Sequence, residues 1–150
     1  MTDRPSWDDF FKGLAVYWSQ MSTCSRRKVG AVVVKNKTVL GEGFNGVVSG
    51  KKHCIDGGCP RGQHYRTRPS GVIYDQCACG KLWPCPDSAE PGSDYNAALC
   101  HAIHAEANAL YRAGLDACDG ATLYVNAEPC PQCSALIERF GIKEVVIVDE

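Results

Sequence analysis

The sequence predicts a three-layer α/β/α domain with a mixed central sheet, and three observations support this fold class. Residues 29–34 and 38–44 are β-rich runs separated by a polar Lys-Asn-Lys turn, which indicates an antiparallel hairpin. Residues 121–126 and 142–148 are strand-like runs on either side of a helical segment. Strands joined in this way are expected to be parallel, with a right-handed crossover. Helical patterns before the hairpin and between the later strands supply the outer layers.

The first helix is expected to begin after Ser6, a typical N-cap residue followed three positions later by Asp9. Apolar residues then recur at helical spacing, and Ser22 and Thr23 mark the expected end of the helix. The apolar positions of this helix are Trp7, Phe10, Phe11, Leu14, Trp18 and Met21.

The second half of the chain returns to regular periodicity after a long irregular stretch. Residues 101–112 form an Ala-rich pattern that predicts a helix closed by Gly114. Residues 131–140 predict a second helix closed by Gly141. The final run, 142–148, is rich in β-branched residues and is expected to be a buried strand.

Residues 47–99 differ from the rest of the chain in composition. They are rich in Gly, Pro, Cys and polar residues and show no lasting period, which is unusual for so long a loop in a compact domain. A bound metal could order this stretch where apolar packing does not. Residues 1–150 are therefore expected to form a single domain with an insert at 47–99. The cysteines of the insert are Cys54, Cys59, Cys77, Cys79 and Cys85.

Composition excludes several classes of protein. No apolar run approaches the roughly 18–20 residues of a membrane span, and the N-terminus lacks the features of a signal peptide. A net charge of −1 argues against a partner that is a nucleic acid. The expected location is the cytoplasm, with no membrane partner. In that compartment ten cysteines favour metal binding over disulfides.

Two short motifs place metal-binding residue types at expected helix starts. His104 lies in His-Ala-Glu, and Cys130 and Cys133 lie in Pro-Cys-Pro-Gln-Cys. One nitrogen and two sulfur donors suit tetrahedral zinc and leave a fourth position for water. We expect both cysteines in the first turn of one helix, where the dipole favours thiolates, and His104 in the first turn of another. Taken separately, the cysteines could form a redox pair and His104 could cap its helix.

Glu106 is the candidate catalytic residue of this group. It follows His104 by two positions, which on a regular helix is roughly 200° around the axis. The two side chains would therefore not share a face, although the start of a helix can tolerate this. A carboxylate beside the open metal position can carry protons without being a ligand.

Together the motifs match the H-x-E…P-C-x-x-C pattern of zinc nucleobase deaminases. The chain resembles the cytidine and deoxycytidylate deaminase superfamily, and within it the deoxycytidylate (dCMP) deaminases. The resemblance covers most of the chain except the middle of the insert. Its segments are STCSRRKVGAVVV at 22–34, GFNG at 43–46, HAEANAL at 104–110, GATLYV at 120–125 and EPCPQC at 128–133.

This resemblance implies a cytidine-deaminase-like fold and the hydrolysis of dCMP to dUMP and ammonia, which supplies dUMP for thymidylate synthesis. It implies that His104, Cys130 and Cys133 bind a catalytic Zn²⁺. Glu106 would take a proton from the attacking water and pass it to ring N3, then to the departing ammonia.

The resemblance also implies substrate contacts. Asn45 would contact the sugar, and the backbone N–H of Ala105 would bind the pyrimidine O2. Tyr124 is either near the ring or packed in the sheet, and strand aromatics favour packing. Residues 26–28 form a basic run in which Arg26 is the first candidate for a 5′-phosphate contact, with a solvated turn as the alternative.

A second, structural Zn²⁺ is implied by cysteines that flank the first strand and the Gly-Phe-Asn-Gly motif. The four expected ligands are Cys24, Cys54, Cys59 and Cys100. The competing ligands are His53 and His101. A third cluster, either a metal site with His64 or a set of free thiols, comprises Cys77, Cys79 and Cys85.

The chain departs from the family pattern in two places. Phe44 stands where the motif usually has Tyr, and the chain ends directly after the fourth strand, where relatives usually continue. The family forms homo-oligomers with dCTP and dTTP as effectors. We expect a homo-oligomer here, while both departures put effector regulation in question.

Three alternative functions remain open at this point. The first is deamination of dCTP or a modified dCMP, and the second is deamination of tRNA adenosine, which low basic charge disfavours. The third is a zinc-stabilised binding module without activity. Glu106 argues against the module, because a structural zinc site needs no carboxylate beside an open position.

Overall fold

The computed structural model describes residues 3–24, 27–56, 58, 72–77, 79–83, 85 and 101–149. The chain divides into two compact units. The first, here called the sheet unit, comprises Met1–Thr23, Arg27–Gly46 and Ile103–Glu150. The second, here called the insert unit, comprises Cys24–Arg26 and Val47–Ala102, and contains a short 3-10 helix η1 (Cys54–Asp56). The insert expected at 47–99 falls within the second unit, and the single domain stays a prediction.

A mixed four-stranded sheet forms the centre of the sheet unit, with strand order β2-β1-β3-β4. β1 (Gly30–Lys35) pairs antiparallel with β2 (Thr38–Phe44) on one side, which confirms the expected hairpin. On its other side β1 pairs antiparallel with β3 (Thr122–Val125). β3 pairs in parallel with β4 (Glu144–Ile147), as the intervening helix predicted.

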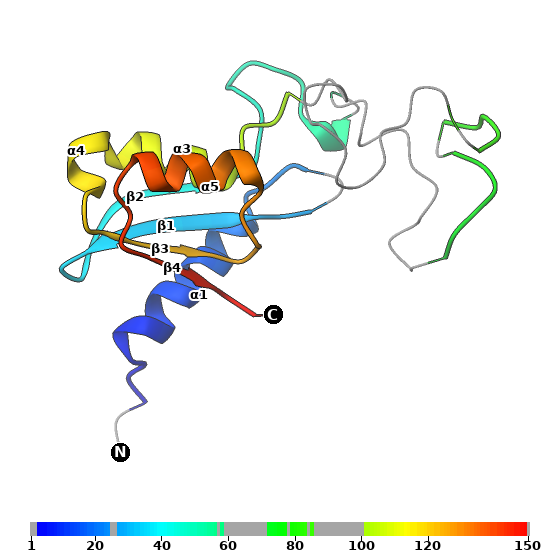
Figure 1. Ribbon diagram of the computed structural model, residues 1–150. Coiled ribbons are helices and arrows are strands. Elements are labelled where there is room, and N and C mark those ends of the chain that lie inside the picture. The colour runs from blue at the N-terminus through cyan, green and yellow to red at the C-terminus, as the bar shows by residue number, and fades with distance from the viewer. Residues whose placement is uncertain are drawn as a thin grey trace. The chain divides into compact units, whose positions relative to one another are not determined.

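Helices cover both faces of this sheet, which confirms the three layers (Figure 1). On one face α1 (Trp7–Ser19) packs through Phe11 and Ala15. The other face holds α3 (Ala105–Ala113), α4 (Leu115–Cys118) and α5 (Pro131–Arg139). Successive residues of a strand point to opposite faces. In β1 the residues facing α1 are Val32 and Val34, and those facing the α3 layer are Ala31 and Val33.

The first helix begins where the sequence predicted and ends earlier. Ser6 caps it by accepting a hydrogen bond from the Asp9 backbone N–H at 3.0 Å. The helix ends at Ser19, before the expected Ser22. The Ser22 hydroxyl donates to the Asn45 carbonyl at 2.9 Å, which draws the chain toward the end of β2.

The helix expected over 101–112 begins at Ala105 instead, so that boundary was wrong. The reason is a long-range pairing that local pattern cannot reveal. Ile103 and Gly46 form an antiparallel bridge, with N···O distances of 2.8 and 3.1 Å. Residues paired in this way must be extended, which leaves His104 as the N-cap of α3. The expected end is confirmed, because Gly114 has φ 89°.

The burial expected for the last strand was also wrong. In β4 Val145 is 36% exposed and Ile147 is 38% exposed. β4 lies at the edge of the sheet with β3 as its one strand neighbour. An apolar run gives the same pattern for a central and an edge strand, so the sequence could not separate the two.

Within the described residues, no helix has the length and apolar character needed to cross a bilayer.

Glycine in β2 allows α3 to lie close to the sheet. A Cβ atom on Gly43 would lie 2.7 Å from the Ala105 carbonyl oxygen and 2.7 Å from Cβ of Asn108. Gly43→Ala is therefore expected to lower the free energy of unfolding by about 1–3 kcal/mol through overpacking. Gly13→Ala, at an exposed position of α1 where nothing lies within 4 Å, should raise the free energy of unfolding by about 0.5–1 kcal/mol. Denaturant unfolding of both variants tests the contrast, and equal stabilities would contradict it.

Candidate functional site

Two helix starts supply the residues of the candidate site. His104 is the N-cap of α3, with φ −67° and ψ 150°. Cys130 is the N-cap of α5, with φ −70° and ψ 166°, and its sulfur accepts from the Cys133 backbone N–H at 3.4 Å. His104 and Cys130 were expected inside the first turns and instead precede them, because both have extended backbone. The positive ends of the two helices favour thiolate at this point.

The three expected metal ligands lie together. The Nδ1 atom of His104 is 3.3 Å from Sγ of Cys133 and 3.4 Å from Sγ of Cys130. All three ligand atoms lie within 4.8 Å of one another. Tetrahedral zinc, with Zn–N of about 2.0–2.1 Å and Zn–S of about 2.3 Å, would set the N···S distance at about 3.6 Å. The donor set and its spacing therefore fit zinc to within a few tenths of an ångström.

Glu106 lies beside this group without belonging to it. Its side chain is buried, 4% exposed, and Oε2 lies 3.7 Å from Sγ of Cys133. Because His104 is an N-cap with extended backbone, the roughly 200° separation of a regular helix does not apply to the pair. The side chains of His104 and Glu106 therefore both reach the sulfur atom of Cys133, although regular helical geometry predicted that they would lie on different faces.

Burial dominates the electrostatics of the site. Loss of solvent raises the pKa of the Glu106 carboxyl above its usual value, against the opposing effects of His104, Cys133 and Arg27. Burial also raises the pKa of the Cys133 thiol, and the neighbouring Glu106 and Cys130 raise it further. A buried thiol beside a buried carboxyl avoids two uncompensated negative charges. Binding a cation would supply the compensation and release protons.

The predicted sugar contact, Asn45, uses its side chain to hold the main chain before β1. Oδ1 accepts from the Val29 N–H at 2.9 Å, and Nδ2 donates to the Arg27 carbonyl at 2.7 Å. Asn45 is half-buried, and its contact with a sugar stays a prediction. Ala105 is fully buried as the first residue of α3. Its N–H is one of the four at a helix start that have no acceptor within the helix.

Sequence reasoning included Arg27 only as a member of the basic run at 26–28, and it missed Asn126. Arg27 is exposed, and its charge acts on Glu106, whereas the favoured Arg26 lies outside the described residues. Asn126 is 6% exposed. Its Oδ1 accepts from the Gly30 N–H at 2.8 Å, and its Nδ2 donates to the Lys28 carbonyl at 3.2 Å. A polar residue that ends an apolar strand just before the Pro-Cys motif was the available signal.

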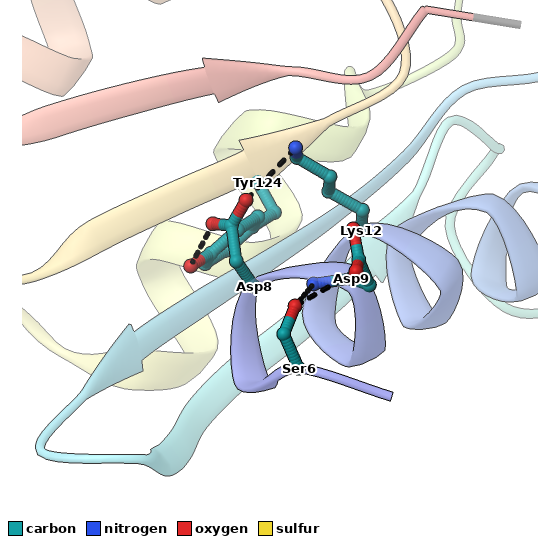
Figure 2. A network of polar contacts seen from close by, with 5 residues as sticks. All are labelled: Ser6, Asp8, Asp9, Lys12 and Tyr124. Carbon is teal, nitrogen blue, oxygen red and sulfur yellow. Dashed lines mark hydrogen bonds and ion pairs between the residues drawn. The ribbon is translucent and has the colours of Figure 1, made fainter. Parts of the chain in front are cut away.

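Tyr124 lies in β3 on the face that packs against α1 (Figure 2). Its hydroxyl donates to Oδ1 of Asp8 at 3.0 Å, and its ring centroid lies 5.6 Å from that of Phe11. Asp8 also pairs with Lys12 at 2.8 Å. These contacts agree with the packing alternative, and a contact with substrate stays an untested prediction.

The Tyr124 hydroxyl gives a test of stability at high pH. Burial, followed by the Asp8 hydrogen bond, raises the pKa of Tyr124 from 10.0 to about 12. The folded state therefore keeps this proton longer, so its stabilisation is complete below pH 10 and is lost as pH rises toward 12. Tyr124→Phe should be about 1 kcal/mol less stable at neutral pH and lose less stability above pH 10. Parallel unfolding curves at all pH values would contradict this.

The expected structural zinc ligands are described only in part. Cys54 is buried in η1 and Cys24 is half-buried, both in the insert unit. Cys59 and Cys100 lie outside the described residues. The four-cysteine site stays a prediction.

Residues 5–149 match the family model described as the cytidine and deoxycytidylate deaminase zinc-binding region. A deoxycytidylate deaminase of Mycobacterium phage D29 is 43% identical over 150 residues, covering 98% of this chain and 98% of the phage protein. A deoxycytidylate deaminase of Schizosaccharomyces pombe is 35% identical over 144 residues, covering 95% of this chain and 37% of its own length. The crystal structure of the cyanophage S-TIM5 dCMP deaminase with dCMP and dUMP superposes with a TM-score of 0.57 at 28% identity, covering 96% and 82% of the two chains.

Proposed function

The chain belongs to the cytidine and deoxycytidylate deaminase family, and we propose that it hydrolyses dCMP to dUMP and ammonia in the cytoplasm, so supplying dUMP for thymidylate synthesis. One observation carries the proposal: His104, Cys130 and Cys133 converge from two helix starts with buried Glu106 beside them. The similarity to a phage deoxycytidylate deaminase over nearly the whole of both chains supports the choice of substrate.

In this proposal His104, Cys130 and Cys133 hold a catalytic Zn²⁺. Zinc bound by three protein ligands would activate a water molecule for attack at neutral pH. The two caps fix the ligands on rigid helix starts, and Asn126 ties the strand before Cys130 to the backbone of Lys28 and Gly30. In this proposal the helix starts and the Asn126 hydrogen bonds hold the ligand residues in position.

Glu106 moves protons in the proposed reaction. The oxygen of water forms a bond to C4 of cytosine, and the C4–N bond to the amino group breaks. Glu106 takes one proton from the water and delivers it to ring N3. It then takes the second proton from the hydroxyl now on C4 and gives it to the leaving amino group, which departs as ammonia and leaves a carbonyl at C4. A carboxylate close to the ligand sulfurs, yet outside the ligand group, has the position that both transfers require.

The remaining substrate groups are assigned to the start of α3 and the segment before β1. The Ala105 N–H would donate to the pyrimidine O2, since it projects from the start of the helix. The main chain at Arg27–Val29, held by the Asn45 side chain, would present basic side chains to the 5′-phosphate. Arg27 is exposed and close enough for its charge to act on Glu106, so we add it to Arg26 as a phosphate contact.

A substrate panel tests this assignment. Wild-type protein is expected to deaminate dCMP with a higher kcat/KM than deoxycytidine or dCTP. Arg27→Ala should raise KM for dCMP by about tenfold, which corresponds to the loss of one charged hydrogen bond, and leave deoxycytidine unchanged. Arg139→Ala, at the exposed end of α5, is the matched control. A higher kcat/KM for dCTP or deoxycytidine would contradict the choice of dCMP as the substrate. If Arg27→Ala raised KM equally for dCMP and deoxycytidine, Arg27 would not be a phosphate contact.

Assembly and regulation are proposed by analogy with the family. We expect a homo-oligomer with dCTP and dTTP as candidate effectors. Phe44, in the motif position that usually holds Tyr, stacks on Trp18 with ring centroids 6.2 Å apart. Sedimentation with and without each nucleotide, run beside the activity assay, tests both expectations.

A further inference from the structure

A second group of thiols lies in the insert unit and takes no part in the proposed reaction. It consists of Cys77, Cys79 and Cys85, whose sulfur atoms all lie within 4.8 Å of one another. We propose that these three cysteines bind a structural Zn²⁺ that orders the segment from residue 72 to residue 85. Its three ligands are different residues from those of the His104 group and from the four cysteines expected from the family resemblance.

The spacing of the sulfur atoms fits a shared metal. Sγ of Cys79 and Sγ of Cys85 are 3.8 Å apart. A disulfide bond would bring them to about 2.0 Å. Two thiolates on one tetrahedral zinc, each with a Zn–S distance of about 2.3 Å, would lie about 3.8 Å apart. The observed separation therefore matches the one that two ligands on a single zinc ion would have.

The choice of buried residues in this segment is the opposite of that in a hydrophobic core. Cys77 is 1% exposed and Cys85 is 3% exposed, and they are the two buried residues among those described from 72 to 85. Four large apolar side chains of the same stretch are exposed, and Trp83 is half-buried. The exposed four are Val72 49%, Ile73 61%, Tyr74 46% and Leu82 79%. The interior of the segment thus consists of sulfur in place of aliphatic groups. Small segments that cannot build an apolar core are commonly stabilised by a structural metal.

The backbone forms a tight turn around the thiols. Gly80 donates to the Cys77 carbonyl at 2.9 Å, and Cys77 donates to the Lys81 carbonyl at 2.8 Å. Gly80 has φ 95°, a left-handed conformation that glycine adopts without strain. The bridge between Gln76 and Leu82 then returns the chain, which brings Cys85 back toward Cys77 and Cys79. Three ligands from one short segment are thus held by local hydrogen bonds.

Zinc is the metal that this donor set favours. Thiolates are soft ligands, and a site rich in sulfur selects zinc over hard cations such as Mg²⁺ and Ca²⁺. A closed structural site takes four ligands, so a fourth donor completes the three thiolates. Cys79 is exposed, which leaves one side of the cluster accessible to that donor.

The test is peptide-resolved alkylation of the native, full-length protein, with Zn²⁺ as the probe. With zinc bound, Cys77, Cys79 and Cys85 should all react slowly, exposed Cys79 included, and removal of zinc by a chelator should accelerate all three together. Cys118, which is 0% exposed in the core of the sheet unit, is the control and should react slowly in both conditions. Rates for the three cysteines that do not change with chelator, or recovery of a Cys79–Cys85 disulfide, would overturn the proposal.

A variant provides a second measurement. Cys79→Ser combined with Cys85→Ser should lower the zinc content of the purified protein by one equivalent and leave the turnover of dCMP measurable, because neither residue belongs to the His104 group. Unchanged zinc content would overturn the proposal. The alkylation experiment does not depend on activity, so it separates failure of this site from failure of the proposed function.

Discussion

Replacing Glu106 by Gln is expected to lower kcat for ammonia release from dCMP by roughly 10²–10⁴-fold, the scale of a lost general acid–base group. The amide keeps the size of the side chain but cannot take a proton from water or pass one to ring N3. Zinc content should be unchanged, because Glu106 is not one of the ligands. The measurement is the steady-state rate of dUMP formation, with metal analysis of the same sample.

Glu138→Gln is the matched control for this experiment. Glu138 is exposed on α5, the helix that carries Cys133, so the same chemical change there should leave kcat within about twofold, as for most surface substitutions. A Glu106→Gln protein with kcat within a few-fold of wild type would remove Glu106 from the proposed mechanism.

Replacing Cys133 by Ser is the second change with a large expected effect. It removes one of the three proposed protein ligands, so the protein is expected to lose its catalytic zinc and, with it, nearly all turnover of dCMP. Added zinc at about 100 times its Kd stabilises a binding-competent fold by about 2.7 kcal/mol. The wild-type Tm should therefore rise with zinc more than that of Cys133→Ser.

Cys118 offers a control of the same residue type and similar burial. Cys118 is 0% exposed and Cys133 is 4% exposed, but Cys118 contacts the Leu110 carbonyl and no other thiol in the described part of the chain. Cys118→Ser should keep catalytic zinc and turnover even where it lowers stability. Equal loss of zinc in both variants would indicate a general folding defect and contradict the assignment of Cys133 as a ligand.

Periodicity and cap residues carried enough information to place most of the fold. The hairpin, the parallel pair and the helix ends at Gly114 and Gly141 follow from signals within a few residues of each position. The start of α3 could not be found in this way, because the bridge from Ile103 to Gly46 that keeps the chain extended joins distant parts of the sequence. The prediction that β4 is buried was wrong for a related reason, because the position of a strand at the edge of a sheet is a property of the whole sheet.

The candidate site, like the fold, could be predicted from the sequence only in part. His104, Cys130 and Cys133 follow from residue type and spacing, and the structure brings them together. The roles of His104 and Cys130 as N-caps depend on the extended backbone before each helix, which motif spacing does not specify. Asn126 was missed because its importance lies in hydrogen bonds to Lys28 and Gly30, on a strand distant in sequence.

The central claim is that the chain is a zinc-dependent hydrolase of dCMP. The most direct measurement is to incubate the zinc-loaded wild-type protein with dCMP in water labelled with ¹⁸O and to analyse the products by mass spectrometry. We expect one dUMP and one ammonia for each dCMP consumed, with one ¹⁸O atom as the carbonyl oxygen on C4 of the uracil. Zinc-loaded protein that leaves dCMP, dCTP and deoxycytidine all unconverted would contradict the account.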